Sequence, residues 1–342
     1  MTSKDSYAIK VGARILVTGA NGFVASSITD FLLSLGYLVR GTVRSEKPWL
    51  NETFEAKYGA GKFETVNVPA LDDDKSLEAA LNGISGVIHV ASDVTFGRDP
   101  TKVIPAVVAG TETVLRAASK VPSVKRVVLT SSSVAAALLE PGEGDVPLSQ
   151  DTWSTGAIEA AWSENTPPEL KGYMVYAASK AEGERAAFGW VEKNKPGFVF
   201  NSVLPDFAIG EVLHPNIGST GTLTAQLLKG DDTVIKLIVS QYFIDVKDVA
   251  RLHAIALLDP SVRSERLFGC AAEYSWKEVV ETLHELRPSV DTIVKDMPPP
   301  REGFVNIVPT NRSKELLSSF FGRSDWTSLK DSLEACILSL ML

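Results

Sequence analysis

The segment RILVTGANGFVAS, residues 14–26, joins a short apolar run to a glycine-containing turn and the start of a helical pattern. Its small residues are spaced Gly19-x-x-Gly22-x-x-Ala25. Glycine lets the backbone turn sharply and approach a pyrophosphate closely, and the N-terminus of the next helix favours negative charge. Because the turn lies between a predicted strand and a predicted helix, we interpret it as a dinucleotide-binding turn rather than an ordinary tight turn. The residues expected to contact the cofactor here are Gly19, Asn21, Gly22, Phe23 and Val24.

Further apolar runs follow along the chain, separated by longer helical patterns. Alternation of strands and helices predicts a parallel sheet covered by helices on both faces, which is a Rossmann-type doubly wound α/β fold. The later predicted strands cover residues 37–43, 62–68, 86–92, 125–133 and 197–205.

The second predicted strand carries arginines where an acid is expected. In dinucleotide folds an acidic residue about 20 positions after the turn holds the ribose 2′-hydroxyl. Here residues 39–44 read VRGTVR, so the charged residues are Arg40 and Arg44. A guanidinium is the natural partner of a 2′-phosphate, which predicts NADPH/NADP+ as the cofactor. The alternative is that both arginines are solvated surface charges.

The chain changes character after Pro205, where loops and helices rich in glycine, serine and threonine begin. Residues 241–258 resemble a short strand and a helix that return to the main body, 297–303 form a Pro-rich connector, and the last 30 residues are predicted to be helical. We expect an NADP-binding Rossmann domain of residues 1–205 plus about 236–270. The remaining parts, about 206–235 and 271–342, are expected to form a smaller, mostly helical substrate-binding lobe.

The stretch GYMVYAASKAE, residues 172–182, contains two tyrosines and a lysine that suggest proton transfer. Its alanines, lysine and glutamate favour a helix. Residues four apart lie on one helical face, so Tyr176 and Lys180 are expected to be neighbours, whereas Tyr173 lies two turns from the lysine. Tyr176 is therefore the preferred proton donor, and Tyr173 is interpreted as packing or pocket wall.

Composition limits the choice of partners. Of 342 residues, 44% are hydrophobic and 22% charged, which is typical of a globular protein with an ample core. The net charge of −8 argues against nucleic acid and anionic membranes. The polar N-terminus lacks the apolar core of a signal peptide, and no apolar run reaches membrane-spanning length. The chain has only two cysteines, which fits a reducing compartment, so we expect a cytoplasmic protein. We expect it to be a monomer or a homodimer.

These motifs, in this order and spacing, resemble the extended short-chain dehydrogenase/reductases. The resemblance covers most of the chain and rests on the glycine turn, HVAS (89–92), TSSS (130–133), the YxxxK pair, LPDFAIG (204–210) and FIDVKDVARLHAIAL (243–257). The branch it resembles most is the dihydroflavonol-reductase-like group, with the fungal aldehyde and carbonyl reductases within it.

The resemblance implies a nicotinamide cofactor, a Ser–Tyr–Lys active site and a substrate pocket between two lobes. Carried over by position, the catalytic residues are Ser132, Tyr176 and Lys180. Ala91 and Pro205 would lie near the cofactor, and Arg40 and Arg44 match the arginines that bind NADP in this branch.

Two positions depart from the branch. Ala70 stands where an acid commonly contacts the adenine, which puts that contact in doubt. Val107 stands where many relatives have an asparagine, so we do not expect an asparagine-based proton relay.

Several residues near these motifs have open assignments. His89 is expected to be a buried strand residue beside the cofactor, and Asp206 either lines the pocket or faces solvent. The four histidines show no metal-ligand spacing. Phe96, Phe207 and Tyr242 are candidates for pocket walls, and ordinary core packing is an equal alternative.

The chemistry follows from these residue types. Reduction of a carbonyl group needs a hydride on carbon and a proton on oxygen. A phenol with an ordinary pKa near ~10 is a slow acid at neutral pH. The Lys180 ammonium is expected to lower that pKa, and the Ser132 hydroxyl to hold the substrate oxygen.

We expect NADPH-dependent reduction of aldehydes and ketones, with aryl ketones or keto esters as the substrate class. Two alternatives lie within the same superfamily: a nucleotide-sugar epimerase or dehydratase, and a hydroxysteroid dehydrogenase. A third is a non-catalytic NADPH-sensing protein, although such proteins tend to lose the Tyr/Lys pair.

Overall fold

The computed structural model describes residues 4–138, 148–217, 220–238, 242–295 and 310–340. Its centre is a seven-stranded parallel sheet with the strand order β3-β2-β1-β4-β5-β6-β9. The strands are β1 (Arg14–Val17), β2 (Leu38–Val43), β3 (Phe63–Asn67), β4 (Ile84–His89), β5 (Arg126–Thr130), β6 (Val199–Pro205) and β9 (Arg266–Gly269).

The sheet confirms the predicted doubly wound fold. The central strands β1, β4 and β5 are almost entirely buried, as expected of parallel strands covered on both faces. The strand order reverses between β1 and β4, which pair directly. In open α/β sheets ligands bind at such a reversal, beyond the carboxyl ends of the strands. The six predicted strands all exist, and the seventh, β9, was missed.

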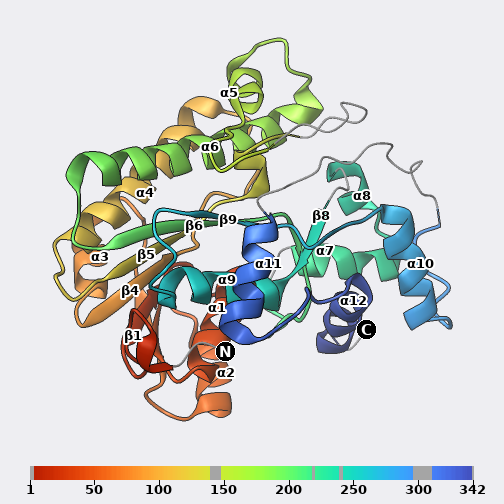
Figure 1. Cartoon of the computed structure of the whole chain (residues 1–342). Coiled ribbons are helices and arrows are strands. Elements are labelled where there is room, and N and C mark those ends of the chain that lie inside the picture. The colour runs from red at the N-terminus through yellow and green to blue at the C-terminus, as the bar shows by residue number, and fades with distance from the viewer. Residues whose placement is uncertain (1–3, 139–147, 218–219, 239–241, 296–309, 341–342) are drawn as a thin grey trace.

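Helices cover both faces of this sheet (Figure 1). One face carries α3 (Asp74–Ala80), α4 (Pro100–Ser119), α5 (Thr155–Trp162) and α6 (Pro168–Asn194). The other carries α1 (Phe23–Ser34), α2 (Pro48–Tyr58), α9 (Val246–Leu258) and α11 (Thr310–Phe321). Among the described residues, none of the helices combines the length and the apolar character needed to cross a membrane.

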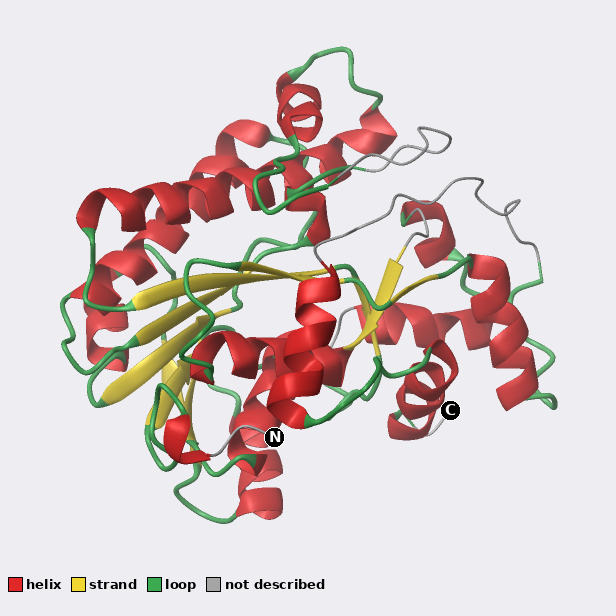
Figure 2. Cartoon of the chain, viewed as in Figure 1, coloured by secondary structure: helices red, strands yellow, loops and turns green. Residues whose placement is uncertain are grey.

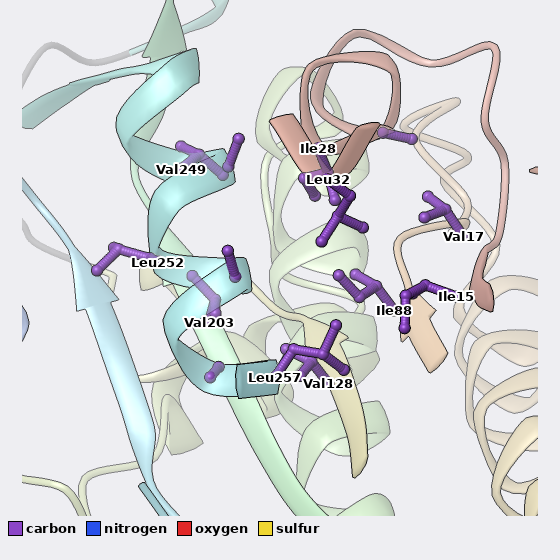
Figure 3. Packing of buried hydrophobic residues seen from close by; sticks show 14 of the residues in the cluster. Ile15, Val17, Ile28, Leu32, Ile88, Val128, Val203, Val249, Leu252 and Leu257 are labelled. Atoms are coloured by element: carbon purple, nitrogen blue, oxygen red, sulfur yellow. The ribbon is translucent and has the colours of Figure 1, made fainter. Parts of the chain in front are cut away.

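The core between α1, α9 and the sheet is made of aliphatic side chains (Figure 3). Ile28 and Leu32 of α1 meet Ile15 and Ile88 of the central strands, and each is fully buried. Burying one such side chain contributes about 1.5–3 kcal/mol. This packing holds the N-terminus of α1 against the carboxyl end of β1, where the glycine turn lies.

A smaller body lies beside the carboxyl edge of the sheet (Figure 2). Its three-stranded sheet has the order β10-β8-β7, from β7 (Phe207–Ile209), β8 (Tyr242–Asp245) and β10 (Ala272–Glu273). Its helices are α7 (Thr220–Gln226), α8 (Thr233–Leu237), α10 (Trp276–Leu286) and α12 (Leu329–Ser339).

Two expected boundaries need correction. Strand β8 was assigned to the main body, but it pairs with β7 and β10, so only α9 and β9 of residues 236–270 join the large sheet. Helix α11 was assigned to the substrate lobe, but Leu317 and Phe320 pack into the core of the main body. The expected Pro-rich connector 297–303 lies outside the described residues.

Candidate active site

The glycine turn at the carboxyl end of β1 fits a closely approaching phosphate group. Gly19 has φ +67°, a left-handed conformation that favours glycine, and a Cβ there would lie 3.1 Å from the Ala91 Cβ. Its amide donates to the Thr42 Oγ1 at 3.1 Å. The turn is therefore fixed between the ends of β1, β2 and β4, and it brings the predicted cofactor residues Gly19 and Ala91 into contact.

The N-terminus of α1 is open to an anion. Gly22 is its N-cap and supplies no side-chain cap, and the first turn carries no acid. The first amides of a helix have no partner inside the helix, so anions stabilise this end. The phenyl ring of Phe23 is buried, and Val24 is half-buried. Together with the close backbone turn at Gly19, these features suit a dinucleotide pyrophosphate.

The two arginines of the second strand have different roles. The Arg40 guanidinium, which is only 15% exposed, pairs with Glu64 of β3 at 2.8 Å and donates to the Ala80 and Asn82 carbonyl oxygens at 2.8 Å. It lies in mid-strand, paired in register with Leu16 and Glu64.

The expectation that Arg40 binds a 2′-phosphate is therefore wrong, because its donors are engaged beneath the site. Arg44 follows the end of β2, is exposed, and has no ion-pair partner among the described residues. It is the arginine available to a cofactor.

The Tyr/Lys pair lies on α6 as the helical spacing predicted. Tyr176 is half-buried and Lys180 is buried, with the Lys180 Nζ 6.0 Å from the centre of the Tyr176 ring. The ammonium donates to the Thr130 carbonyl at 3.3 Å, at the end of β5. Burial lowers the pKa of Lys180 to about 8, and nearby Glu184 opposes that shift.

Ser132 is brought to the same place. It is buried after the end of β5, and its hydroxyl forms a hydrogen bond with the Tyr176 phenol. The net pKa of Tyr176 is raised, first by burial and also by Asp206, although the Ser132 hydrogen bond lowers it. The net shift is upward, opposite to the lowering expected from the lysine, so the phenol stays protonated at neutral pH.

A buried charge network behind the pair was missed by sequence reasoning. Glu184, one turn beyond Lys180, accepts from the Arg266 Nε and Nη2 at 3.1 and 2.9 Å. It also accepts from the hydroxyls of Ser131, at 2.9 Å, and Ser202. Arg266 lies over the Trp153 ring, 4.0 Å from its centre. The network joins α6, β6, β9 and the segment after β5. The helical spacing of Lys180 and Glu184 was the signal in the sequence that could have indicated it.

His89 is a buried residue at the end of strand β4, as expected, and it lies near Lys180. The Thr18 hydroxyl accepts from the Val90 and Ala91 amides, so it donates to the His89 Nδ1 at 2.8 Å. The imidazole is therefore neutral, and burial together with Lys180 lowers its pKa to about 3.

A small cavity lies beneath the pair, between the sheet and helices α4 and α6. Val107 is part of its wall, and the buried Ser92 hydroxyl has no hydrogen-bond partner among the residues that the structure describes. The cavity is lined by His89, Ala91, Ser92, Val107, Thr111, Leu129, Thr130, Ser131, Ser179, Lys180, Gly183 and Glu184.

The other candidates divide between pocket and core. Pro205 is buried at the end of β6, at the edge shared with Ser132. Phe96 is 42% exposed, has φ +54° and lies over the rings of Tyr173 and Tyr176, at 6.5 and 5.1 Å between centres. A non-glycine residue in the left-handed region often marks a functional site. Phe207 packs in the core of the small lobe, and the Tyr242 hydroxyl donates to Glu273 at 3.3 Å.

The geometry defines a nicotinamide-dependent Rossmann enzyme, with a nucleotide turn beside a Ser–Tyr–Lys cluster. The model of the NAD dependent epimerase/dehydratase family matches residues 15–268. The chain belongs to that family, the extended short-chain dehydrogenase/reductases, which confirms the predicted resemblance.

Curated relatives match over nearly the whole chain. Ketoreductase nvfG of Aspergillus novofumigatus is 44% identical and covers 98% of each chain. Aldehyde reductase 2 of Sporidiobolus salmonicolor is 36% identical, also over 98% of each chain.

Solved structures share the fold. A reductase engineered for asymmetric catalysis has a TM-score of 0.80 at 26% identity, over 97% of this chain and 100% of that one. Yeast methylglyoxal/isovaleraldehyde reductase Gre2 complexed with NADPH has a TM-score of 0.79 at 23% identity, over 96% and 98%.

Proposed function

We propose that the protein reduces aldehydes and ketones to alcohols with NADPH. The proposal rests on one observation: the hydroxyl groups of Ser132 and Tyr176 and the amine of Lys180 lie close together, beside the N-terminus of α1, which has no side-chain cap. Relatives named ketoreductase and aldehyde reductase, at 44% and 36% identity, support the same reaction. Aryl ketones and keto esters are the substrate class we propose.

The chain's own groups act on the carbonyl oxygen. A bound nicotinamide supplies the hydride to the carbonyl carbon. Ser132 donates a hydrogen bond to the oxygen as negative charge develops there. Tyr176 transfers its proton to that oxygen, and its raised pKa keeps this proton in place until then. The Lys180 ammonium then stabilises the phenolate by its positive charge.

The cofactor would be held by the residues of the turn. The Gly19–Gly22 backbone and the N-terminus of α1 suit the pyrophosphate. Arg44 is placed to donate to a 2′-phosphate, and β2 offers no acid that would select NAD. This combination favours NADPH and argues against the epimerases that keep NAD bound.

The test is consumption of NADPH, followed by absorbance, with a panel of aldehydes, aryl ketones and keto esters. Steady consumption is expected with wild type. Tyr176→Phe removes the phenol hydroxyl and with it the proton to be transferred, so turnover should fall by at least about 10²-fold while NADPH still binds. The matched control is Tyr173→Phe, which keeps the ring next to Phe96 and should retain most activity.

Two outcomes would contradict the proposal. NADPH binding without consumption by any carbonyl compound would favour a sensor. Loss of turnover in Tyr173→Phe but not in Tyr176→Phe would show that the proton donor is misassigned.

A further inference from the structure

Asp206 is a carboxyl group at the active site that the reaction described above does not use. It follows the end of β6, the edge at which Ser132 also lies. Its neighbours Pro205 and Phe207 are buried, but Asp206 itself is half-buried. The Asp206 Oδ1 accepts from the Phe207 amide at 2.8 Å, and the carboxyl also accepts from the Ser133 hydroxyl.

The groups around this carboxyl come from both lobes. The charge of Asp206 raises the pKa of Tyr176 in the main body, in addition to burial. It acts in the same way on three groups of the small lobe and its connection, Tyr242, Cys270 and Tyr274, whose pKa values are raised first by burial. None of these is a cation, and Asp206 has no ion-pair partner among the described residues. A carboxylate that is partly withdrawn from water and meets no cation is unfavourable, and this burial raises the pKa of Asp206 to about 6.

A carboxylate in this position is unfavourable in the folded protein unless a bound molecule supplies a hydrogen-bond donor that the described residues do not. It accepts hydrogen bonds strongly and repels other anions. Asp206 follows β6 and Ser132 follows β5, and these two strands pair directly, so both residues lie at the same edge of the sheet. A substrate whose carbonyl oxygen is held at that edge by Ser132 and Tyr176 therefore brings a nearby substituent toward Asp206.

We propose, resting on the carbonyl reduction proposed above, that Asp206 determines substrate specificity at this site. It accepts a hydrogen bond from a hydroxyl group close to the reduced carbonyl, and it disfavours a carboxylate at the same place. The preferred substrates are then hydroxy ketones and the enol forms of 1,3-diketones, and keto acids are poor substrates although their esters are accepted.

The experiment compares two substrate pairs, propiophenone with 3-hydroxypropiophenone and ethyl acetoacetate with acetoacetate. The readout is the ratio of kcat/KM within each pair, because a general loss of activity cancels in a ratio. In wild type the hydroxy ketone and the ester are expected to be preferred. Asp206→Ala should lower the hydroxy-ketone ratio about tenfold or more, the usual effect of one charged hydrogen bond. Asp206→Asn keeps the size and an acceptor for the Phe207 amide, and it should lower the ester-to-acid ratio about tenfold.

Glu273→Gln is the matched control. It removes an exposed carboxylate that accepts from Tyr242 in the same lobe, and it should leave both ratios unchanged. Wild-type ratios that persist in both Asp206 variants, or that change equally in Glu273→Gln, would overturn this proposal while carbonyl reduction stood. A wild-type enzyme that reduced none of the four compounds would instead count against the proposed function.

Discussion

The three consecutive serines after β5 have three different partners. Ser131 donates to the buried Glu184, Ser132 pairs with the Tyr176 phenol, and Ser133 donates to Asp206. The side chains of adjacent residues point in different directions, so only Ser132 of the three pairs with Tyr176. The sequence motif predicts that the serines lie at the active site, but only their hydrogen-bond partners distinguish the roles of the three.

Ser132→Ala should lower kcat by roughly 10²–10³-fold, the usual loss for one donor to a developing oxyanion. Ser131→Ala should retain most turnover and lose about 1.5–3 kcal/mol of unfolding free energy, because it removes one hydrogen bond to a buried carboxylate. Steady-state kinetics and urea unfolding of both variants separate the two effects. A mild Ser132→Ala beside an inactive Ser131→Ala would mean that the motif is misaligned.

Arg40 and Arg44 also differ in their expected roles in coenzyme binding. Arg44→Ala should raise the KM for NADPH and lower the preference for NADPH over NADH by about tenfold or more, since one charged hydrogen bond contributes about 1.5–3 kcal/mol. kcat at saturation should change little, because the 2′-phosphate lies far from the transferred hydride.

Arg40→Ala is the informative control for the coenzyme test. It leaves the Ala80 and Asn82 carbonyls and Glu64 without their donor, so the unfolding free energy should fall by about 1–3 kcal/mol while the coenzyme ratio stays as in wild type. If the NADPH/NADH ratio changed in Arg40→Ala but not in Arg44→Ala, Arg40 would be the residue that binds the 2′-phosphate, as the sequence predicts.

At the scale of elements, the ion pair of Glu184 and Arg266 joins α6 to β9. Both side chains are buried, and Arg266 also donates to the Gln150 and Thr152 carbonyls at 2.9 and 2.7 Å. The network therefore links the helix that carries Tyr176 and Lys180 to the last strand of the sheet. It positions the helix rather than touching the reacting atoms.

Glu184→Ala should lower the unfolding free energy by about 3–5 kcal/mol, because it leaves the Arg266 charge buried and unpaired. Glu182→Ala is the matched control on the same helix. It breaks an exposed pair with Arg185 at 3.4 Å and should cost less than about 1 kcal/mol. Equal unfolding midpoints in urea for the two variants would show that the buried pair contributes no more than the exposed one.

At the scale of the whole molecule, two buried histidines make stability depend on pH. Burial holds the pKa of His89 at about 3 and that of His253 at about 4, both well below the ordinary 6.5. The unfolded chain therefore takes up protons below pH 6.5 that the folded chain does not. The contribution of the two neutral histidines to the unfolding free energy is complete above pH 6.5, and it is lost as the pH falls toward 4.

At pH 5 each histidine should reduce the unfolding free energy by about 2 kcal/mol relative to pH 7, and Asp206, whose pKa is raised to about 6, should offset part of the loss. Urea unfolding at both pH values measures the difference. His253→Asn should lose less stability than wild type on acidification, even if it is less stable at pH 7. An identical loss in both proteins would exclude His253 as a source of the dependence.

Much of the fold was accessible from local pattern. The strand–helix alternation and the glycine turn predicted the parallel sheet, since strand periodicity and turn chemistry are properties of neighbouring residues. Strand β9 and the small sheet were missed because short segments such as 207–209 and 272–273 are recognisable only by the strands they pair with. The position of α11 was also decided by packing, through Leu317 and Phe320.

The sequence by itself determined the nucleotide turn and the facing of Tyr176 and Lys180, because both depend on spacing within one turn or one helix. Only the tertiary structure decided that Arg40 pairs with Glu64, that Glu184 pairs with Arg266, and that the charge of Asp206 acts on Tyr176. Those partners are 24 to 82 residues apart along the chain, and a side chain's charge does not indicate which distant group it will meet. Burial raises the pKa of Tyr176, where the motif alone suggested that it would be lowered. This burial also arises only in the folded chain, where distant segments pack around the tyrosine.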